Sequence, residues 1–349
     1  MPFLEQLSPT QQFLLFSTLK IVAAIFLVLL PMVAYSVLAE RKISAFIQDR
    51  VGPNRVGPFG IWQPLADGLK SFLKEDFTPA HVRKVYFWLA PALSLIPAFL
   101  TVAVIPFGSF LGKQKMVIAD LNVGILYTFG IVSLGVYGIV LAGYAANSKY
   151  PFLGGIRSSA QMISYEIAMG MSVIPVFMLV GDLNLSQVIN YQSGGAWLVF
   201  KQPVSFFIFL VAAFAETNRL PFDLPESETE LVGGYHTEYS SMKFALFFMA
   251  EYANMITSSA MMVTLFFGGW TLPFGGLDQP ASTLAGGLVH IGIFLGKIVV
   301  LMVVFIWVRW MLPRFRYDQL MDLGWRRFIP VALANILATA VVLWLQGAK

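Results

Sequence analysis

The sequence of 349 residues contains no cysteine and only three histidines. The missing cysteines exclude disulfide bonds, iron–sulfur ligation by this chain and thiol nucleophiles. Of His81, His236 and His290, only His290 lies inside an apolar run, so a haem held by histidines of two spans lacks its ligands. We therefore expect no metal site, no redox centre and no bound cofactor in this chain.

Charged residues are also scarce. They make up 12% of the chain, and apolar residues make up 57%, whereas a soluble domain has about 25% charged residues. A soluble protein of this composition would need one very large core with almost no polar surface. Apolar runs of about 20 residues, the length that crosses a bilayer, instead recur along the chain. The sequence therefore predicts an all-α integral membrane protein.

Eight apolar segments are predicted to cross the membrane as helices. The fifth is short and begins after Pro203, a residue that suits a first helical turn, where its missing N–H would have had no partner. With no internal repeat and no linker, residues 1–349 are expected to form one membrane domain. The predicted spans are residues 13–39, 86–106, 121–145, 158–180, 204–219, 240–267, 288–312 and 328–345.

Lysine and arginine are distributed unevenly between the two sides of these spans. The segments after the first, third, fifth and seventh spans carry 17 of the 23 basic residues, the other side carries five, and Lys297 lies within a span. Basic residues concentrate on the cytoplasmic side of membrane proteins, so both termini are expected to be external. The same rule places two long loops, residues 40–85 and 219–240, in the cytoplasm.

The first long loop contains two distinctive stretches. Residues 60–76 read GIWQPLADGLKSFLKED, which puts apolar side chains on one helical face and charged ones elsewhere. This predicts an amphipathic helix along the membrane interface, or equally a helix packed under a neighbouring subunit. Residues 48–57 read QDRVGPNRVG, a compact turn whose arginines face either solvent or an anionic or carbonyl-bearing ligand.

Several ionisable residues lie within predicted spans, and we single out Glu166, Glu216, Glu251 and Lys297. All but Glu216 lie about 14–16 Å from a span end, at 1.5 Å per residue, close to the midplane of a ~30 Å hydrocarbon core. A charge there costs about 2.5–3.5 kcal/mol, so these side chains are expected to face inward and find partners. We predict a hydrated path for protons, with a static Glu–Lys pair as the alternative.

The second long loop is acidic. The stretch from Glu216, just before the loop, to Glu238 within it holds six of the 19 acidic residues of the chain. Carboxylates this close together repel one another and titrate as a coupled group. We interpret Asp223, Glu226, Glu228 and Glu230 as a charge cluster that responds to chemistry nearby, with docking onto a basic partner surface as the alternative.

Five blocks of sequence follow one another in order from about Glu40 to Trp325. They are ERKISAFIQDRVGPNRVGPFGIWQPLADGLKSFLKED, ADLNVGIL, YPFLGGIRSSAQMISYE, ETNRLPFDLPESETELVGGYHTEYS and RYDQLMDLGW. Together they resemble the H-type membrane subunit of bacterial respiratory complex I, whose mitochondrial counterpart is NADH dehydrogenase subunit 1. A single block would not be specific, but five in the same order are.

The resemblance implies an eight-helix subunit of NADH:quinone oxidoreductase in the inner membrane of a bacterial cell. Such a subunit forms the membrane side and entrance of a quinone chamber and couples reduction of ubiquinone or menaquinone to proton translocation. Its partners would be the hydrophilic quinone-module subunits, adjacent small membrane subunits and lipid, but not nucleic acid. FMN, iron–sulfur clusters and NADH would be bound by partner subunits.

Resemblance and residue pattern together give two groups of candidate site residues. The quinone chamber and its entrance are assigned to Arg41, Arg50, Asn54, Arg55, Arg219, Phe222 and Asp223. The coupling path is assigned to Glu166, Glu216, Glu226, Glu228, Glu230, Glu251 and Lys297.

Two other functions fit parts of the sequence. The related subunit of a membrane-bound hydrogenase uses the same scaffold without a quinone, but the complete QDRVGPNRVG and ETNRLPFDLPESETEL blocks favour complex I. A stand-alone cation transporter would explain the glutamates and the lysine inside spans. It would not explain long loops rich in motifs on the side where partners bind.

Overall fold

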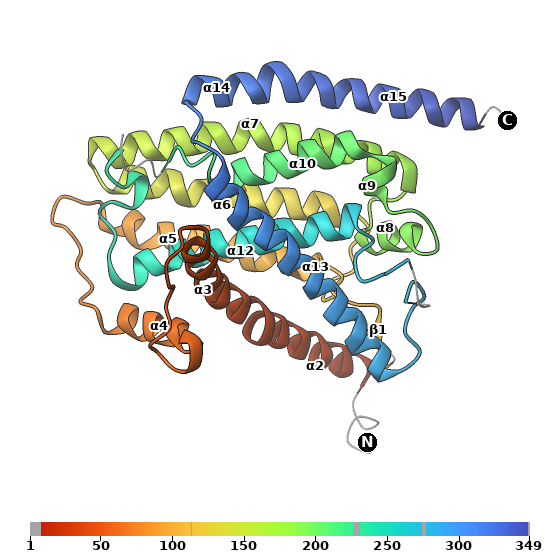
Figure 1. Cartoon of the computed structure of the whole chain (residues 1–349), viewed down its shortest axis with the longest axis horizontal. Helices are drawn as coiled ribbons and strands as arrows, with labels where there is room; N and C mark the ends of the chain where they lie inside the picture. The colour runs from red at the N-terminus through yellow and green to blue at the C-terminus, as the bar shows by residue number, and fades with distance from the viewer. Residues whose placement is uncertain (1–7, 113, 226–230, 274–276, 348–349) are drawn as a thin grey trace.

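The computed structural model describes residues 8–112, 114–225, 231–273 and 277–347. All eight predicted spans fall on helices, which lie side by side in one bundle (Figure 1). The strands within the described residues, β1 (Phe110–Leu111) and β2 (Gln114–Lys115), form one short antiparallel hairpin. The protein is therefore an all-α membrane protein, as the composition predicted.

The first helix is continuous through three segments. α2 (Pro9–Val22) passes into a π-helical segment (Ala23–Leu29) and then into α3 (Leu30–Ile47). The first half of the chain continues with a 3₁₀ turn (Pro58–Gly60), α4 (Gln63–Leu73), α5 (Lys84–Leu100), a second 3₁₀ turn (Thr101–Val104), α6 (Gly124–Ala145) and α7 (Lys149–Val180).

The second half contains shorter helices between the long ones. Its elements are α8 (Leu185–Gln192), α9 (Leu198–Lys201), α10 (Pro203–Glu216), a 3₁₀ turn (Gly234–His236), α12 (Ser241–Phe266), α13 (Leu284–Met311), α14 (Tyr317–Asp322), a π-helical segment (Leu323–Phe328) and α15 (Ile329–Gly347). α5, α6, α7, α10 and α12 form the body of the bundle, α13 crosses it obliquely, and α15 packs along α7 (Figure 1).

Six helices in the described part of the chain are long and apolar enough to cross a membrane. The other two predicted spans differ from these. α10 is apolar but has only 14 residues, which at 1.5 Å per residue is about 21 Å. α12 has 26 residues, but it carries Glu251 and Asn254 and is largely enclosed by the other helices. Each of these two helices supplies a carboxylate to the interior, Glu216 from α10 and Glu251 from α12.

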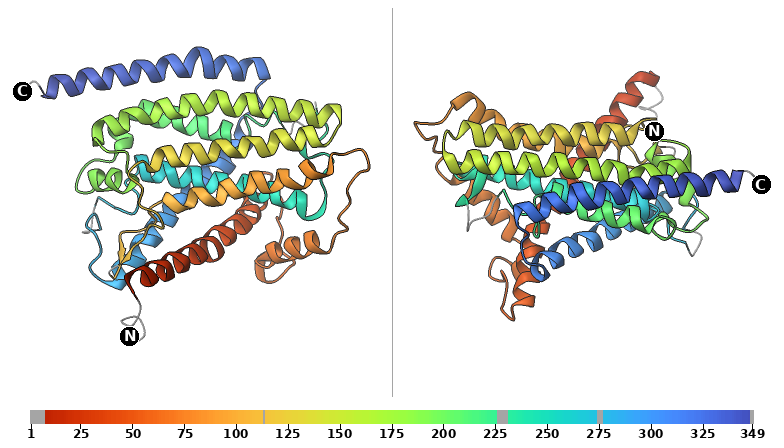
Figure 2. Two further views of the ribbon diagram at one scale, coloured as in Figure 1. Left: turned by 180° about the vertical axis from the view of Figure 1, so that it is seen from behind. Right: turned by 90° about the horizontal axis from the view of Figure 1, so that it is seen from above.

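The start of α2 and the end of α15 lie at the same end of the bundle (Figures 1 and 2). α4 lies toward the opposite end, beside α3 and α12. The two ends of a chain lie on the same side of a membrane when the chain crosses it an even number of times. The prediction that this shared end faces the cell exterior depends on the distribution of basic residues and stays a prediction.

Two predicted boundaries in the first long loop are wrong. α3 continues to Ile47, eight residues beyond the predicted span end at Ala39, because Glu40 is buried among basic partners instead of ending the helix in water. The amphipathic helix occupies Gln63–Leu73 and not 60–76. Phe59 and Gly60 have φ angles of 52° and 77°, a left-handed conformation that a regular helix cannot include.

Close packing of α5 on α6 depends on a missing side chain. A Cβ atom at Gly138 would lie 2.2 Å from Ser94 Oγ and 2.6 Å from the Ser94 backbone N. Small residues at such crossings let membrane helices approach closely and gain dispersion contacts. Gly130, two turns earlier on α6, has open space where its Cβ would be.

We therefore expect Gly138→Val to destabilise the protein by about 1–3 kcal/mol, the usual cost of overpacking a filled interior. Thermal unfolding in detergent would measure this cost. Gly130→Val is the matched control and should unfold within a few degrees of the unaltered protein. Equal loss in both variants would contradict a role for the α5–α6 contact.

Candidate functional site

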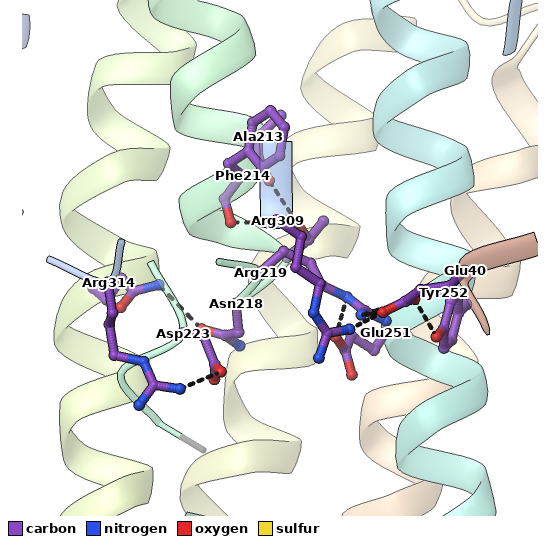
Figure 3. Close-up of polar contacts among 12 residues, drawn as sticks. Glu40, Ala213, Phe214, Asn218, Arg219, Asp223, Glu251, Tyr252, Arg309 and Arg314 are labelled. Carbon is purple, nitrogen blue, oxygen red and sulfur yellow. Dashed lines mark hydrogen bonds and ion pairs between the residues drawn. The ribbon is translucent and has the colours of Figure 1, made fainter. Parts of the chain in front are cut away.

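Five polar side chains from four parts of the chain meet inside the bundle (Figure 3). Arg219 Nη1 lies 3.2 Å from both carboxylate oxygens of Glu40, and Arg219 Nε forms an ion pair with Glu251. Arg309 of α13 forms a second ion pair with Glu40, and the Tyr252 hydroxyl donates to Glu40 Oε2 at 2.5 Å. We call these five residues the central ion cluster.

The central ion cluster is held together by several contacts per charge. The side chains of Glu40, Arg219 and Glu251 are only 10%, 7% and 12% exposed. A buried ion pair offsets its desolvation cost only when the geometry is good and further hydrogen bonds satisfy the remaining groups. Each Glu40 oxygen here has two donors. The Arg219 guanidinium also lies 4.4 Å from the centre of the Tyr252 ring, a cation–π contact.

A turn just after α10 aims Arg219 at Glu40. Gln161 of α7 donates through Nε2 to the carbonyl oxygens of Ala215 at 2.6 Å and Phe222 at 2.8 Å, which brings the two ends of the turn together. Asn218 within it has a φ of 51°, a conformation that asparagine adopts more readily than most residues. Local turn chemistry and one buried amide therefore fix the position of the arginine.

Phe222 and Asp223 follow Arg219 and are attached to the segment after α13. Asp223 Oδ2 accepts a charged hydrogen bond from Arg314 Nη2 at 2.9 Å, and the Phe222 ring stacks on Phe315 with centroids 5.5 Å apart. The first part of the acidic loop is therefore fixed to the protein body (Figure 3). Glu226, Glu228 and Glu230 lie outside the described residues, so their assigned role stays a prediction.

A small polar cavity of about 30 Å³ lies beside Glu216 and Glu251. Asn218 and Asn254 contribute to its wall. Space of this size between polar groups is enough to hold water. Glu216 is buried, and its Oε2 atom has no hydrogen-bond partner among the described residues. The structure thus brings these two predicted path residues to one polar space.

Glu166 lies on α7, which packs against α10. Its Oε1 atom accepts a hydrogen bond from the Ser133 hydroxyl of α6. The carboxylates of Glu166 and Glu216 are near enough for their charges to interact. Three of the predicted path residues, Glu166, Glu216 and Glu251, are therefore neighbours in the bundle interior.

Lys297 does not join them. Its Nζ atom donates to the carbonyl oxygens of Phe267, Gly269 and Thr271 at 2.7, 2.8 and 2.6 Å. Phe267 follows Glu251 by 16 residues along α12, about 24 Å of helix. The expected common depth of Lys297 and Glu251 is therefore wrong. Lys297 instead compensates the carbonyl groups at the C-terminal end of α12, where a helix carries partial negative charge.

The predicted entrance residues lie on the surface near α4. Arg41 forms an ion pair with Asp67 of α4 at 2.8 Å, which joins the end of α3 to the amphipathic helix. Arg50 Nε donates to Gln48 Oε1 at 2.7 Å. Arg41, Arg50, Asn54 and Arg55 are all exposed. The apolar side chains of α4 are exposed as well; they are Leu65, Leu69, Phe72 and Leu73.

Glu40, Tyr252, Arg309 and Arg314 are absent from the residues predicted from sequence. Charged residues next to the end of an apolar run usually contact water or lipid headgroups, so neither Glu40 nor the two arginines stood out. The one signal in the sequence was an acidic residue directly before two basic ones, ERK at 40–42. An isolated carboxylate at such a helix end needs a cation, and the sequence does not say which one supplies it.

The sequence pattern of the NADH dehydrogenase family matches residues 19–340. The chain belongs to this family. Curated relatives named as H-type subunits of NADH-quinone oxidoreductase include a protein of Cytophaga hutchinsonii that is 51% identical over 341 residues, which cover 96% of this chain and 98% of the relative. The protein of Koribacter versatilis is 48% identical over 352 residues, which cover 96% of this chain and 98% of the relative. The protein of Flavobacterium psychrophilum is 50% identical over 332 residues, which cover 93% of this chain and 96% of the relative.

The match to the NADH dehydrogenase family extends over nearly the whole chain. It therefore includes the central ion cluster, the polar cavity and α4. The relatives are subunits of an enzyme complex. The family assignment agrees with the resemblance carried by the five sequence blocks.

We expect Arg219→Met to destabilise the protein by about 3–5 kcal/mol, because removal of one partner leaves buried charge uncompensated. Arg41→Met is the matched control. It removes an arginine from an exposed ion pair, which should cost no more than about 1 kcal/mol. Thermal unfolding of the purified protein at fixed salt would compare the two variants. Similar stability losses would show that the central ion cluster is not the stabilising contact.

Proposed function

We propose that this chain is the membrane subunit of a bacterial NADH-quinone oxidoreductase, in which it forms the membrane side of the quinone chamber and couples quinone reduction to proton translocation. The names of its relatives support the assembly and the enzyme. They favour this function over that of the related hydrogenase subunit. Electrons would reach the quinone from a redox centre in a partner subunit.

The observation that carries the coupling proposal is a polar connection from the surface to the bundle interior. Glu40, in the central ion cluster, directly precedes Arg41, which reaches α4 through Asp67. In the other direction, Arg219 connects Glu40 to Glu251, and Glu251 faces the cavity shared with Glu216. A change of charge near the surface can therefore act on the interior carboxylates through ion pairs in a medium that screens poorly.

The quinone entrance is proposed at α4 and the turn before it. A quinone has a polar head and a long apolar tail, and binding sites for such molecules combine apolar walls with a few placed polar groups. α4 offers exposed apolar side chains, and Arg41, Arg50 and Arg55 lie beside it. The rest of the chamber wall would come from the hydrophilic partner subunits. Leucines this exposed on a cytoplasmic surface also need a bilayer or a partner to cover them.

We expect Arg50→Ala in the assembled complex to raise KM for quinone and to weaken inhibition by quinone-site inhibitors several-fold. The reason is loss of a guanidinium that can donate to the quinone head or orient its entry. Arg326→Ala is the matched control, since Arg326 is an exposed arginine of the C-terminal π-helical segment. Quinone kinetics of membranes containing equal amounts of complex give the measurement. Unchanged KM and inhibitor sensitivity in Arg50→Ala would remove this residue from the entrance.

The proton path is proposed through Glu216, the polar cavity and Glu251, with Glu166 as a neighbouring carboxylate. Of these, Glu251 is held by Arg219, so it serves better as a sensor of charge than as a carrier of protons. Glu216 has an oxygen without a hydrogen-bond partner among the described residues and lies beside space for water. We therefore assign the titrating role to Glu216.

Glu216→Gln keeps the side-chain volume and removes the titration. We expect a complex that assembles normally but pumps fewer protons per NADH oxidised, or oxidises NADH more slowly in coupled vesicles. Asp318→Asn, at an exposed acidic residue of α14, should leave both values unchanged. Proton release and NADH oxidation in reconstituted vesicles would be measured together. Normal coupling in Glu216→Gln would exclude this path while leaving the family assignment intact.

A further inference from the structure

An apolar cavity of about 380 Å³ lies away from the proposed quinone entrance. Its walls come from residues 16–32 of the first helix, residues 102–111 and 114–116 around the β hairpin, residues 256–260 of α12 and residues 291–298 of α13. These stretches belong to the half of the bundle that contains the start of α2 and the end of α12, the half predicted to be external. Nothing in the proposed function uses this cavity.

The wall of the cavity is almost entirely aliphatic and aromatic, with one ionisable residue, Lys20. Lys20 Nζ donates to the carbonyl oxygen of Val117 at 3.1 Å. An ammonium group has three N–H donors, so Lys20 can still bind an anionic acceptor at this position. The cavity therefore combines a long apolar interior with a single cation.

The cavity borders the surface that the first helix presents to the bilayer. Leu19 contributes to the wall and is 55% exposed, and the nearby Phe26 and Leu27 are 61% and 75% exposed on the same helix. The opposite wall is closed, since Ala260, Phe294 and Ile298 are buried. A molecule dissolved in the bilayer can therefore enter from the side, whereas one arriving from water would first have to cross lipid-facing surface.

The backbone of the first helix widens beside the cavity. The π-helical segment Ala23–Leu29 supplies Ala23, Ala24, Val28 and Leu29 to the wall. π-helical turns inside helices are uncommon and occur frequently at functional sites. Here the two alanines leave room that larger side chains would fill. The volume is also within the range of about 300–1,000 Å³ that is typical of small-molecule sites.

We propose that this cavity binds one acyl chain of an anionic phospholipid, with the lipid phosphate next to Lys20 Nζ. The acyl chain would fill the cavity and make dispersion contacts with its walls. Water would not fill it, because an apolar cavity of this kind stays dry. Lys20 provides the charge complementarity that selects an anionic headgroup. The site is distinct from the proposed quinone entrance: Met32, at its inner end, is nine residues before Arg41, the first residue assigned to the entrance, or about 14 Å along the helix.

The test uses the assembled complex in lipid nanodiscs. The probes are phosphatidylglycerol and phosphatidylcholine that carry the same photoactivatable group near the end of one acyl chain. Mass spectrometry then locates the cross-links. We expect cross-links in peptides that contain residues 16–32 and 291–298. Phosphatidylglycerol should be cross-linked about fivefold more than phosphatidylcholine, because one lysine near an anionic lipid confers a preference of this size.

Two variants divide the proposal into its parts. Ala260→Phe adds bulk to the buried wall and should reduce cross-linking of both lipids several-fold, whereas Ala338→Phe, at an exposed position of α15, should not. Lys20→Gln should abolish the preference for phosphatidylglycerol and keep cross-linking of phosphatidylcholine. Lys201→Gln, at an exposed lysine outside the cavity, should keep the preference.

Absence of lipid cross-links from residues 16–32 and 291–298 of the unaltered complex would overturn the proposal, even if Ala260→Phe failed to assemble. Lipid cross-links found only on a helix of a neighbouring subunit would overturn it too, since the acyl chain would then lie outside the cavity. Equal labelling by both lipids would overturn the headgroup assignment. Coupling and quinone kinetics do not enter these readouts, so the result is independent of the proposed function.

Discussion

The ion pair between Glu40 and Arg219 is the contact on which the interior of this protein depends. It joins α3 to the turn after α10, and through Glu251 and Arg309 it reaches α12 and α13. Charges withdrawn from water are stable only when their partners are in place. The four chain segments must therefore meet in one arrangement, and the long first helix has to continue past the predicted membrane boundary to bring Glu40 there.

The same contact explains how a strongly apolar bundle can contain a group of buried charges. Membrane helices gain little from the hydrophobic effect when they pack together, so polar side chains and small residues determine their contacts. α10 and α12 are the helices that depart from the pattern of a simple span, one in length and one in composition. They also supply Glu216 and Glu251, which share the polar cavity. The helices that depart from an ideal span are thus the ones that bring these two carboxylates to one cavity.

The two halves of the bundle are chemically different. One half holds the exposed arginines, α4 and the central ion cluster, whereas the other holds an apolar cavity with a single lysine. Charge in the first half suits a partner and a polar ligand head, and the apolar cavity in the second suits a hydrocarbon chain. Lys297 lies in the second half, where it donates to carbonyl oxygens at the end of α12 and takes no part in the glutamate group.

Sequence alone determined the membrane class, all eight helical segments, the amphipathic helix and the family, because apolar run length, helical period and ordered motifs are local properties. The tertiary structure decided the partners of each charge. Glu40 and Arg219 are separated by 179 positions in the chain, and no local pattern relates them. Glu166, Glu216 and Glu251 were expected to meet and do lie together, but Lys297 was expected beside them and is not. The position of a residue along a span gives only its depth in the membrane. The direction in which its side chain points, and the groups that it contacts, depend on the tilt and rotation of the helix in the folded bundle.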